Sequence, residues 1–308
     1  MTFSELIQAI VNGIVDGSLW GILAIGFGLI LGVSGRFHFA YATTFVVAIY
    51  VTAHLHTGGM PLAAAIVLGV VAAVLLGVLI EGYLYRPLVA AAGATALLAV
   101  FVTSLGVVVI GENVIRLVWG SAPLTLPTGY MVTRVSLGGG VGVTTLDLVI
   151  AGVGVVVTAA LWSFIRHAQY GRAIRAVQEN PDMATAVGVQ PERVYLFVFA
   201  VGSALSGIAA ILLTQQTAGA PDAGVEPTFT ALVAVFLAGL RSSPIRFMLA
   251  GVFIGLLQNV VTIWINGLWS PVVTFGLLFV YLAFLPYLEA HPLRLRLPRS
   301  RAHALGQT

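Results

Sequence analysis

The residues able to do chemistry are few, and their spacing forms no catalytic set. The chain contains no cysteine, which excludes disulfides and thiol chemistry. It also contains no lysine, so a P-loop, which needs Lys at the phosphates, is excluded. His54 and His56 are two residues apart and cannot share a helix face, and no His, Asp and Glu have metal-ligand spacing. We predict no catalytic residue, no metal and no cofactor.

The densest polar segment is the loop 166–193, which lies between two apolar runs. Gly171 is expected to end the preceding run, and Arg172 to Gln178 are good helix formers. Ile174 and Val177 are three residues apart and share one helix face. A short helix with one apolar face is therefore predicted.

A second short helix is predicted directly after the first. Asn180 suits an N-cap, Pro181 the first helical position, and Gly188 the stop. Its apolar stripe is Met183, Ala184 and Val187. Helices this short are marginal in water and must dock, on the membrane interface or on a partner protein. The partner is favoured, because helices that lie on lipid usually carry bulky Trp, Phe or Leu anchors.

The elements around this loop are apolar enough to cross a membrane. The 308 residues are 59% hydrophobic and 8% charged, whereas about a quarter of an average soluble domain is charged. We predict an all-α polytopic membrane protein with a bundle of about nine helices, in a range of eight to ten. The apolar segments are 6–33, 39–56, 61–85, 95–118, 145–165, 193–215, 228–240, 245–264 and 270–288.

Arginine placement predicts the orientation. With 166–193 in the cytoplasm, only Arg116 and Arg134 lie outside, and the tail 291–308 lies inside, near lipid headgroups. The scattered arginines do not indicate a nucleic-acid partner.

Small residues predict how the helices pack. Gly13, Gly17 and Gly21 repeat every fourth residue, and Gly251 and Gly255 do the same later in the chain. Such spacing lets helix backbones approach closely in a membrane.

Ionisable and amide residues inside apolar segments are costly and often functional. For Asp16 and Glu81 the simpler interpretation is a position near the membrane interface. Glu112 is expected to pair with Arg116 at i, i+4. Asn259 either bonds to another helix or contacts a substrate.

One string of residues resembles a known family. The string GRAIRAVQENPDMATAVGVQPERV is similar to the cytoplasmic coupling loop of ABC-importer permeases of the branched-chain amino-acid type. Tyr85-Arg86-Pro87-Leu88, Phe39-Ala40 and Phe229-Thr230-Ala231 resemble further family motifs in the same order, so that the similarity covers roughly residues 8–290. The family's Asn-Phe-Ala-His-Gly is His38-Phe39-Ala40-Tyr41-Ala42 here, which leaves the substrate open.

The resemblance implies one permease domain, 1–290, in a bacterial inner membrane. Its partners would be a second permease subunit, two cytoplasmic ATPase subunits and an extracytoplasmic substrate-binding protein. The coupling helix, Pro181 to Val187, would sit in a groove of an ATPase. The residues expected to contact the ATPase are Arg172, Arg175, Glu179, Asp182, Met183, Ala184 and Gly188. Those expected to line the substrate pathway, some of them on a broken segment, are His38, Phe39, Tyr41, Thr43, Thr44 and Asn259.

Two other classes of protein compete with this interpretation. A secondary, ion-coupled transporter needs no ATPase but needs an ionisable residue near the membrane centre. An intramembrane enzyme needs a catalytic set, which the sequence does not offer.

Overall fold

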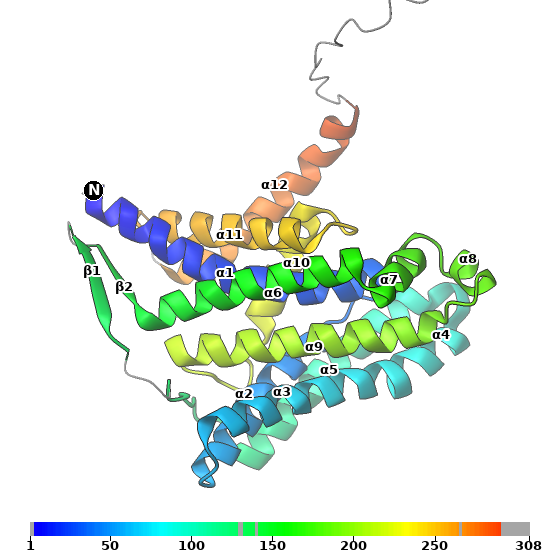
Figure 1. Cartoon of the computed structure of the whole chain (residues 1–308), viewed down its shortest axis with the longest axis horizontal. Helices are drawn as coiled ribbons and strands as arrows, with labels where there is room; N and C mark the ends of the chain where they lie inside the picture. Colours follow the sequence, from blue (N-terminus) through cyan, green and yellow to red (C-terminus); the bar gives the residue numbers. More distant parts are fainter. Residues whose placement is uncertain (1–2, 129–131, 139–140, 265–266, 291–308) are drawn as a thin grey trace, which may run out of the picture.

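The computed structural model describes residues 3–128, 132–138, 141–264 and 267–290 (Figure 1). The predicted tail, 291–308, lies outside the described residues. The long helices are α1 (Phe3–Ser34), α2 (Tyr41–Thr57), α3 (Leu62–Leu79), α5 (Ala96–Trp119), α6 (Thr145–His167), α9 (Pro191–Gln216), α10 (Val225–Ala238), α11 (Pro244–Val261) and α12 (Ser270–Ala290). The short elements are η1 (Ile80–Tyr85), α4 (Arg86–Ala92), η2 (Gly93–Thr95), α7 (Gln169–Glu179), α8 (Pro181–Ala186) and η3 (Gly267–Trp269), with strands β1 (Arg134–Gly138) and β2 (Val141–Thr144).

Each apolar segment predicted from the sequence coincides with one of these long helices, so the all-α polytopic class is confirmed. Within the described residues, five helical stretches are long and apolar enough to cross a membrane. One of them, Leu62–Trp119, bends at α4 and so contains two separate long helices, α3 and α5. The apolar helix α10 is shorter.

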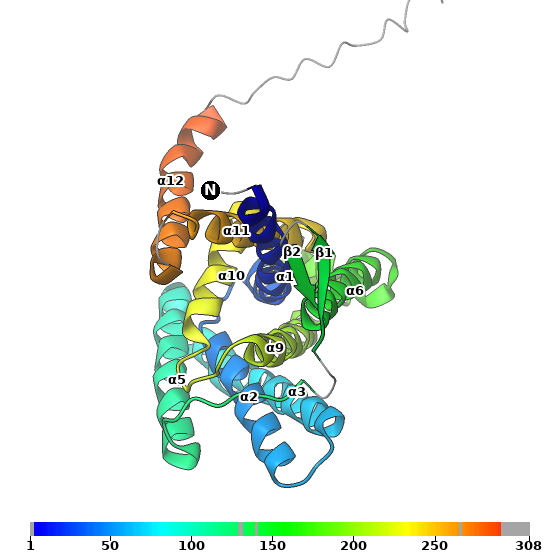
Figure 2. The same cartoon turned by 90° about the vertical axis from the view of Figure 1, so that its left-hand side faces the viewer.

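The helix α1 lies at the centre of the bundle. It packs against α11, α9, α10 and α6, which surround it in both views (Figures 1 and 2). Ile22, Ile25 and Ile30 on α1 are fully buried, although they point in different directions around the helix. A helix segment buried on all sides is apolar around its whole circumference, and the second half of α1, from Leu19 to Val33, is such a segment, whereas Ile10 and Ile14 in the first half are exposed.

The two glycine ladders contact each other and join α1 to α11. A Cβ added to Gly17 would lie 2.5 Å from the Cα of Val252, and one added to Gly255 would lie 2.4 Å from the carbonyl oxygen of Gly13. A Cβ added to Gly251 would lie 2.2 Å from the backbone nitrogen of Gly21. No side chain larger than hydrogen fits at these distances, so the glycines determine how closely the two helices approach.

The loop between α5 and α6 contains a strand pair that the sequence did not predict. β1 and β2 pair antiparallel, with Arg134 opposite Thr144. The side chain of Gln8 in α1 accepts a hydrogen bond from the Gly142 N–H at 2.8 Å and donates one to the Gly142 carbonyl at 3.0 Å. An amide side chain thus completes the edge of β2, a contact between residues far apart in the sequence.

Replacing Gly17 with alanine should destabilise the protein, because the new methyl group overlaps the α11 backbone. We expect the free energy of unfolding to fall by about 1–3 kcal/mol. The matched control is Gly152→Ala in α6, where no atom lies within 4 Å of the added Cβ and alanine is the better helix former. Thermal unfolding in detergent measures both. Equal melting temperatures for the two variants would contradict the role of the glycine contact.

Candidate functional site at the arginine-rich end

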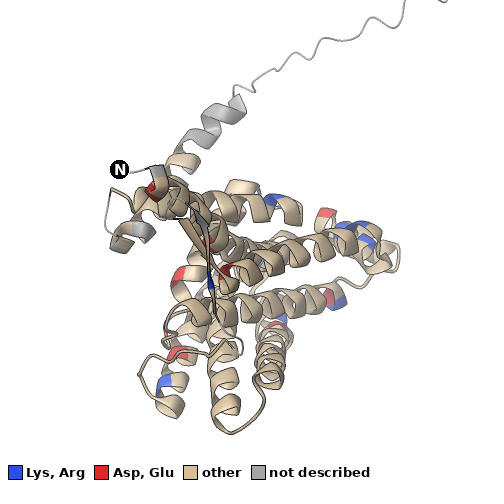
Figure 3. Cartoon of the chain, turned by 60° about the vertical axis from the view of Figure 1, so that its left-hand side comes forward, with Lys and Arg blue, Asp and Glu red and all other residues tan. Residues whose placement is uncertain are grey.

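Basic side chains gather at one end of the bundle (Figure 3). Arg36 follows α1, Arg86 begins α4, Arg166 lies in the last turn of α6, and Arg246 lies in the first turn of α11. We call this the arginine-rich end. The start of α1 and the β1–β2 pair lie at the opposite end, which we call the hairpin end.

The loop 166–193 forms an elbow of two helices, α7 and α8, at the arginine-rich end. The predicted break at Gly171 is wrong. The chain leaves α6 at Ala168, which has an extended backbone (φ −71°, ψ 151°), and Gly171 lies within α7. A Cβ at Gly171 would lie 2.4 Å from the carbonyl oxygen of Ile165, so glycine is needed here for a close approach to α6.

The apolar face of α7 is anchored on the bundle. Ile174 and Val177 are buried, as the pattern predicted, and burying each such side chain stabilises the fold by about 1.5–3 kcal/mol. Arg175 donates a hydrogen bond to the Ile165 carbonyl. A Cβ added to Gly32, near the end of α1, would lie 3.2 Å from Nε2 of Gln178, so α7 sits directly on the last turn of α1.

The ends of α8 are formed as the sequence predicted. Oδ1 of Asn180 accepts hydrogen bonds from the backbone N–H groups of Asp182 and Met183, each at 3.0 Å. Pro181 occupies the first turn, and Gly188 after the helix has φ +84°, the left-handed conformation that favours glycine. Both ends of a very short helix are therefore held by local sequence signals.

The apolar residues of α8 do not share one environment. Ala184 is 2% exposed, whereas Met183 is 69% and Val187 is 77% exposed. Of these three residues, only the small alanine turns toward the bundle, and the other two face solvent. Arg172, Glu179 and Asp182 are exposed as well. An open hollow of about 610 Å³ is bordered by Thr185, Gly188, Val189, Gln190, Pro191 and Glu192.

The first of the residues predicted to line the pathway, on the segment after α1, is packed into the interior. Nδ1 of His38 lies 3.0 Å from Oη of Tyr85, and its ring centroid lies 4.8 Å from that of Phe199. Burial lowers the pKa of His38 to about 3, so the imidazole is neutral at physiological pH. A neutral imidazole has one donor and one acceptor nitrogen.

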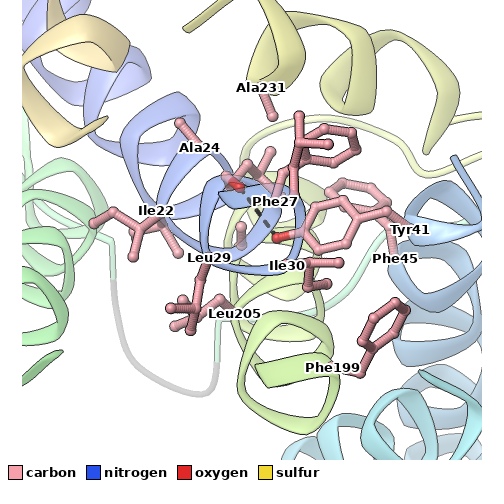
Figure 4. Close-up of a cluster of buried hydrophobic side chains, with 14 of the residues drawn as sticks. Ile22, Ala24, Phe27, Leu29, Ile30, Tyr41, Phe45, Phe199, Leu205 and Ala231 are labelled. Atoms are coloured by element: carbon pink, nitrogen blue, oxygen red, sulfur yellow. Dashed lines mark hydrogen bonds between the residues drawn. The ribbon is translucent and has the colours of Figure 1, made fainter. Parts of the chain in front are cut away.

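Phe39, which lies just before α2, and Tyr41, Thr43 and Thr44 in the first turn of α2 pack in the same region. Tyr41 donates a hydrogen bond to the Leu23 carbonyl at 3.2 Å, drawn as the dashed line in Figure 4. The ring of Phe39 packs against Phe101 and Phe229, with centroids 5.4 and 5.3 Å apart. Thr44 bonds to the Tyr41 carbonyl at 2.8 Å, and Thr43 is also buried. The structure thus brings these residues together in a closed, well-packed arrangement.

Asn259 lies apart from this group. Its Nδ2 donates to Oδ2 of Asp16 at 2.9 Å, which is the interhelical bond that the sequence offered as the alternative to substrate contact. It borders a hollow of about 330 Å³ with residues from the start of α1, including Gln8 and Asn12, at the hairpin end.

One buried ion pair was missed from the sequence. Glu81, for which the sequence favours a position near the membrane interface, is buried within the chain and pairs with Arg36. The signal was available, because Arg36 and Glu81 both fall near those ends of their apolar segments that the arginine pattern predicts to face the cytoplasm. The expected pair of Glu112 and Arg116 is present, at 3.7 Å.

A bundle of apolar helices with a docked, capped elbow at its basic end defines a polytopic integral membrane protein. The chain belongs to the branched-chain amino acid transport system / permease component family, whose model matches residues 9–282. The family resemblance stated from the sequence is confirmed.

The chain is similar to two curated permeases along almost its whole length. It is 29% identical to the high-affinity branched-chain amino acid transport system permease protein LivH of Escherichia coli (strain K12), over 92% of this chain and 95% of that protein. It is 28% identical to the corresponding protein BraD of Pseudomonas aeruginosa, over 91% and 94%. Among solved structures, PsaBC from Streptococcus pneumoniae in complex with Fab matches with a TM-score of 0.48 and 18% identity, over 93% of this chain and 94% of that chain.

Replacing Asn180 with alanine should loosen α8 without unfolding the bundle. The change removes both cap hydrogen bonds, which costs about 1 kcal/mol. We expect faster hydrogen exchange at the amides of Asp182 and Met183 and unchanged exchange in α9. Asn180→Asp, whose carboxylate still accepts both bonds, serves as the control and should exchange like the parent chain. Equal exchange in the alanine variant would show that the cap does not hold α8.

Proposed function

We propose that this chain is the permease subunit of an ABC importer for branched-chain or related amino acids. Residues 1–290 would form half of the translocation pathway in a bacterial inner membrane, with the elbow and the C-terminal tail in the cytoplasm. A second permease subunit would supply the other half. Two cytoplasmic ATPase subunits and an extracytoplasmic substrate-binding protein would complete the importer. The family membership and the names of LivH and BraD support this function.

The observation that supports coupling most directly is the exposure of α8. Met183 lies on the capped helix α8 and Val187 directly follows it, and both are large apolar side chains that are largely solvent-exposed. An amphipathic helix that places such anchors into a groove is a common mode of protein recognition. The charged residues Arg172, Glu179 and Asp182 surround these anchors and suit the polar rim of an interface.

Within the elbow, the predicted contact residues would divide their roles. Met183 and the charged rim would touch the ATPase. Arg175 is exposed but donates to the Ile165 carbonyl, Ala184 is buried against the bundle, and Gly188 follows α8 with a left-handed backbone. We propose that these three residues hold the elbow in shape. The anchored α7 would then carry motion of the docked α8 into the ends of α1 and α6.

We propose that the segment with His38, Phe39, Tyr41, Thr43 and Thr44 borders the pathway and moves when the pathway opens. The support is its break between α1 and α2 and its contact with α10 through Phe39 and Phe229. Asn259, bonded to Asp16, would act at the outer end of the same pathway.

Replacing the α8 anchors with charge should weaken assembly with the ATPase subunits. Met183→Asp and Val187→Asp place a carboxylate in the proposed groove, and loss of a buried anchor weakens binding by ~2 kcal/mol or more. Val135→Asp, at a residue that is also exposed but lies at the hairpin end, is the matched control. Recovery of the ATPase with the tagged permease is the measurement. Undiminished recovery with both α8 variants would refute docking through this helix.

Cysteine labelling tests the orientation and the docking together, because the chain has no cysteine of its own and each introduced cysteine is the single labelling site. A membrane-impermeant maleimide should label Met183→Cys only in inverted vesicles and Ser121→Cys only in intact cells. The ATPase should protect Met183→Cys and leave Ser121→Cys reactive.

The transport reaction separates this proposal from a secondary transporter. Proteoliposomes that contain the assembled importer should accumulate L-leucine only when both ATP and the binding protein are present. Vesicles that contain this chain alone, under a proton or sodium gradient, should accumulate none. Gradient-driven uptake by the chain alone would favour the secondary transporter instead.

A further inference from the structure

A buried ion pair at the arginine-rich end joins the segment after α1 to the end of the third span, and a cation–π contact joins it to α9. Arg36 lies directly after α1 and pairs with Glu81 at the end of the third span. Their side chains are 11% and 3% exposed. Removing one partner of a buried pair leaves an uncompensated charge, so the two residues must stay together as the structure moves.

Glu81 lies on η1, a π-helical segment that continues α3. This turn buries Ile80, Glu81 and Tyr85, and Tyr85 holds the ring of His38. A π-helical turn is rare and is frequently found at functional sites. The end of α3 therefore contacts the segment after α1 through both Arg36 and His38.

The third element is the start of α9, the helix that follows the elbow. The guanidinium of Arg36 lies 5.0 Å from the ring centroid of Tyr195, within the range of a cation–π contact. Phe199, one turn further along α9, packs against His38. The elbow itself contacts α9 nearby, where Tyr170 donates to the Arg193 carbonyl at 3.4 Å.

Two buried atoms in this cluster have no hydrogen-bond partner. Within the described residues, four buried side-chain atoms are unpaired, and two of them are Nε2 of His38 and Oε2 of Glu81. Buried polar atoms are almost always paired, so an unpaired one calls for a physical explanation. A cluster whose hydrogen bonds change between two conformations provides that explanation.

We propose that Arg36, Glu81 and Tyr195 form a latch that transmits motion of the elbow to the segment 35–44. When the elbow moves, the first turns of α9 move with it and Tyr195 shifts against Arg36. Arg36 cannot leave Glu81 without an unpaired buried charge, so the shift passes to the turn between α1 and α2. The three are positioning residues and do not contact the cargo. This inference rests on the proposed function.

The ratio of transport to ATP hydrolysis tests the latch, because a merely structural defect lowers both rates together. Glu81→Gln removes the charge and keeps the shape of the side chain. We expect importers with this variant to assemble and hydrolyse ATP, while the L-leucine taken up per ATP falls about tenfold, within the range that single residues of a coupling network reach.

A second ion pair provides the matched control. Arg86 and Glu192 also join the end of the third span to the start of α9, but their side chains are 53% and 58% exposed. Exposed pairs contribute little, so Glu192→Gln should leave the ratio unchanged. An unchanged ratio in Glu81→Gln as well would overturn the latch.

Tyr195 gives a test that keeps the ion pair intact, in case Glu81→Gln fails to fold. Tyr195→Phe preserves the aromatic ring and should keep the parent ratio, whereas Tyr195→Leu should lower it. Equal ratios in these two variants would overturn the latch. If the parent chain does not assemble with ATPase subunits at all, the proposed function fails and the latch fails with it, an outcome distinct from a normal complex with an unchanged ratio.

Discussion

The close contact between α1 and α11 is the constraint on which the rest of the structure depends. The helix α1 can lie at the centre of the bundle only because its glycines leave room for another backbone. In a membrane the lipid tails are as apolar as the side chains, so close van der Waals packing supplies much of the attraction between helices. Once α1 is central, α6, α9 and α10 pack around it, and its two ends are brought against the hairpin and the elbow.

Polar groups follow a second constraint, which is that nearly all of them find a partner or reach water. At the hairpin end, Asp16 meets Asn259, and Gln8 meets the edge of β2. At the arginine-rich end, Arg36 meets Glu81 inside the bundle, while the charges of the elbow remain in solvent. In these apolar surroundings a charged side chain without a partner is costly. Separating a buried pair is therefore unfavourable, and each such pair holds two helices together.

These constraints place the parts of the proposed importer in a physical order. An exposed α8 continues from an anchored α7, which lies on the last turn of α1. The segment after α1 carries Arg36 and His38 and leads into α2, which is packed against α3 and α9. A continuous series of contacts therefore runs from the surface of the elbow to the interior, which is the route that the proposed coupling would use.

The sequence by itself determined the membrane class, the apolar spans, the caps of α8 and the family, because apolar length, cap residues and a collinear motif are local properties of the chain. It also predicted close packing from the glycine spacing. Only the tertiary structure decided that Gly17 meets α11, that Asn259 bonds to Asp16, that Ala184 is buried beside an exposed Met183, and that Glu81 pairs with Arg36. Each of these contacts depends on which faces of two different helices pack together. The periodicity of the residues within one helix does not specify which helix becomes its neighbour.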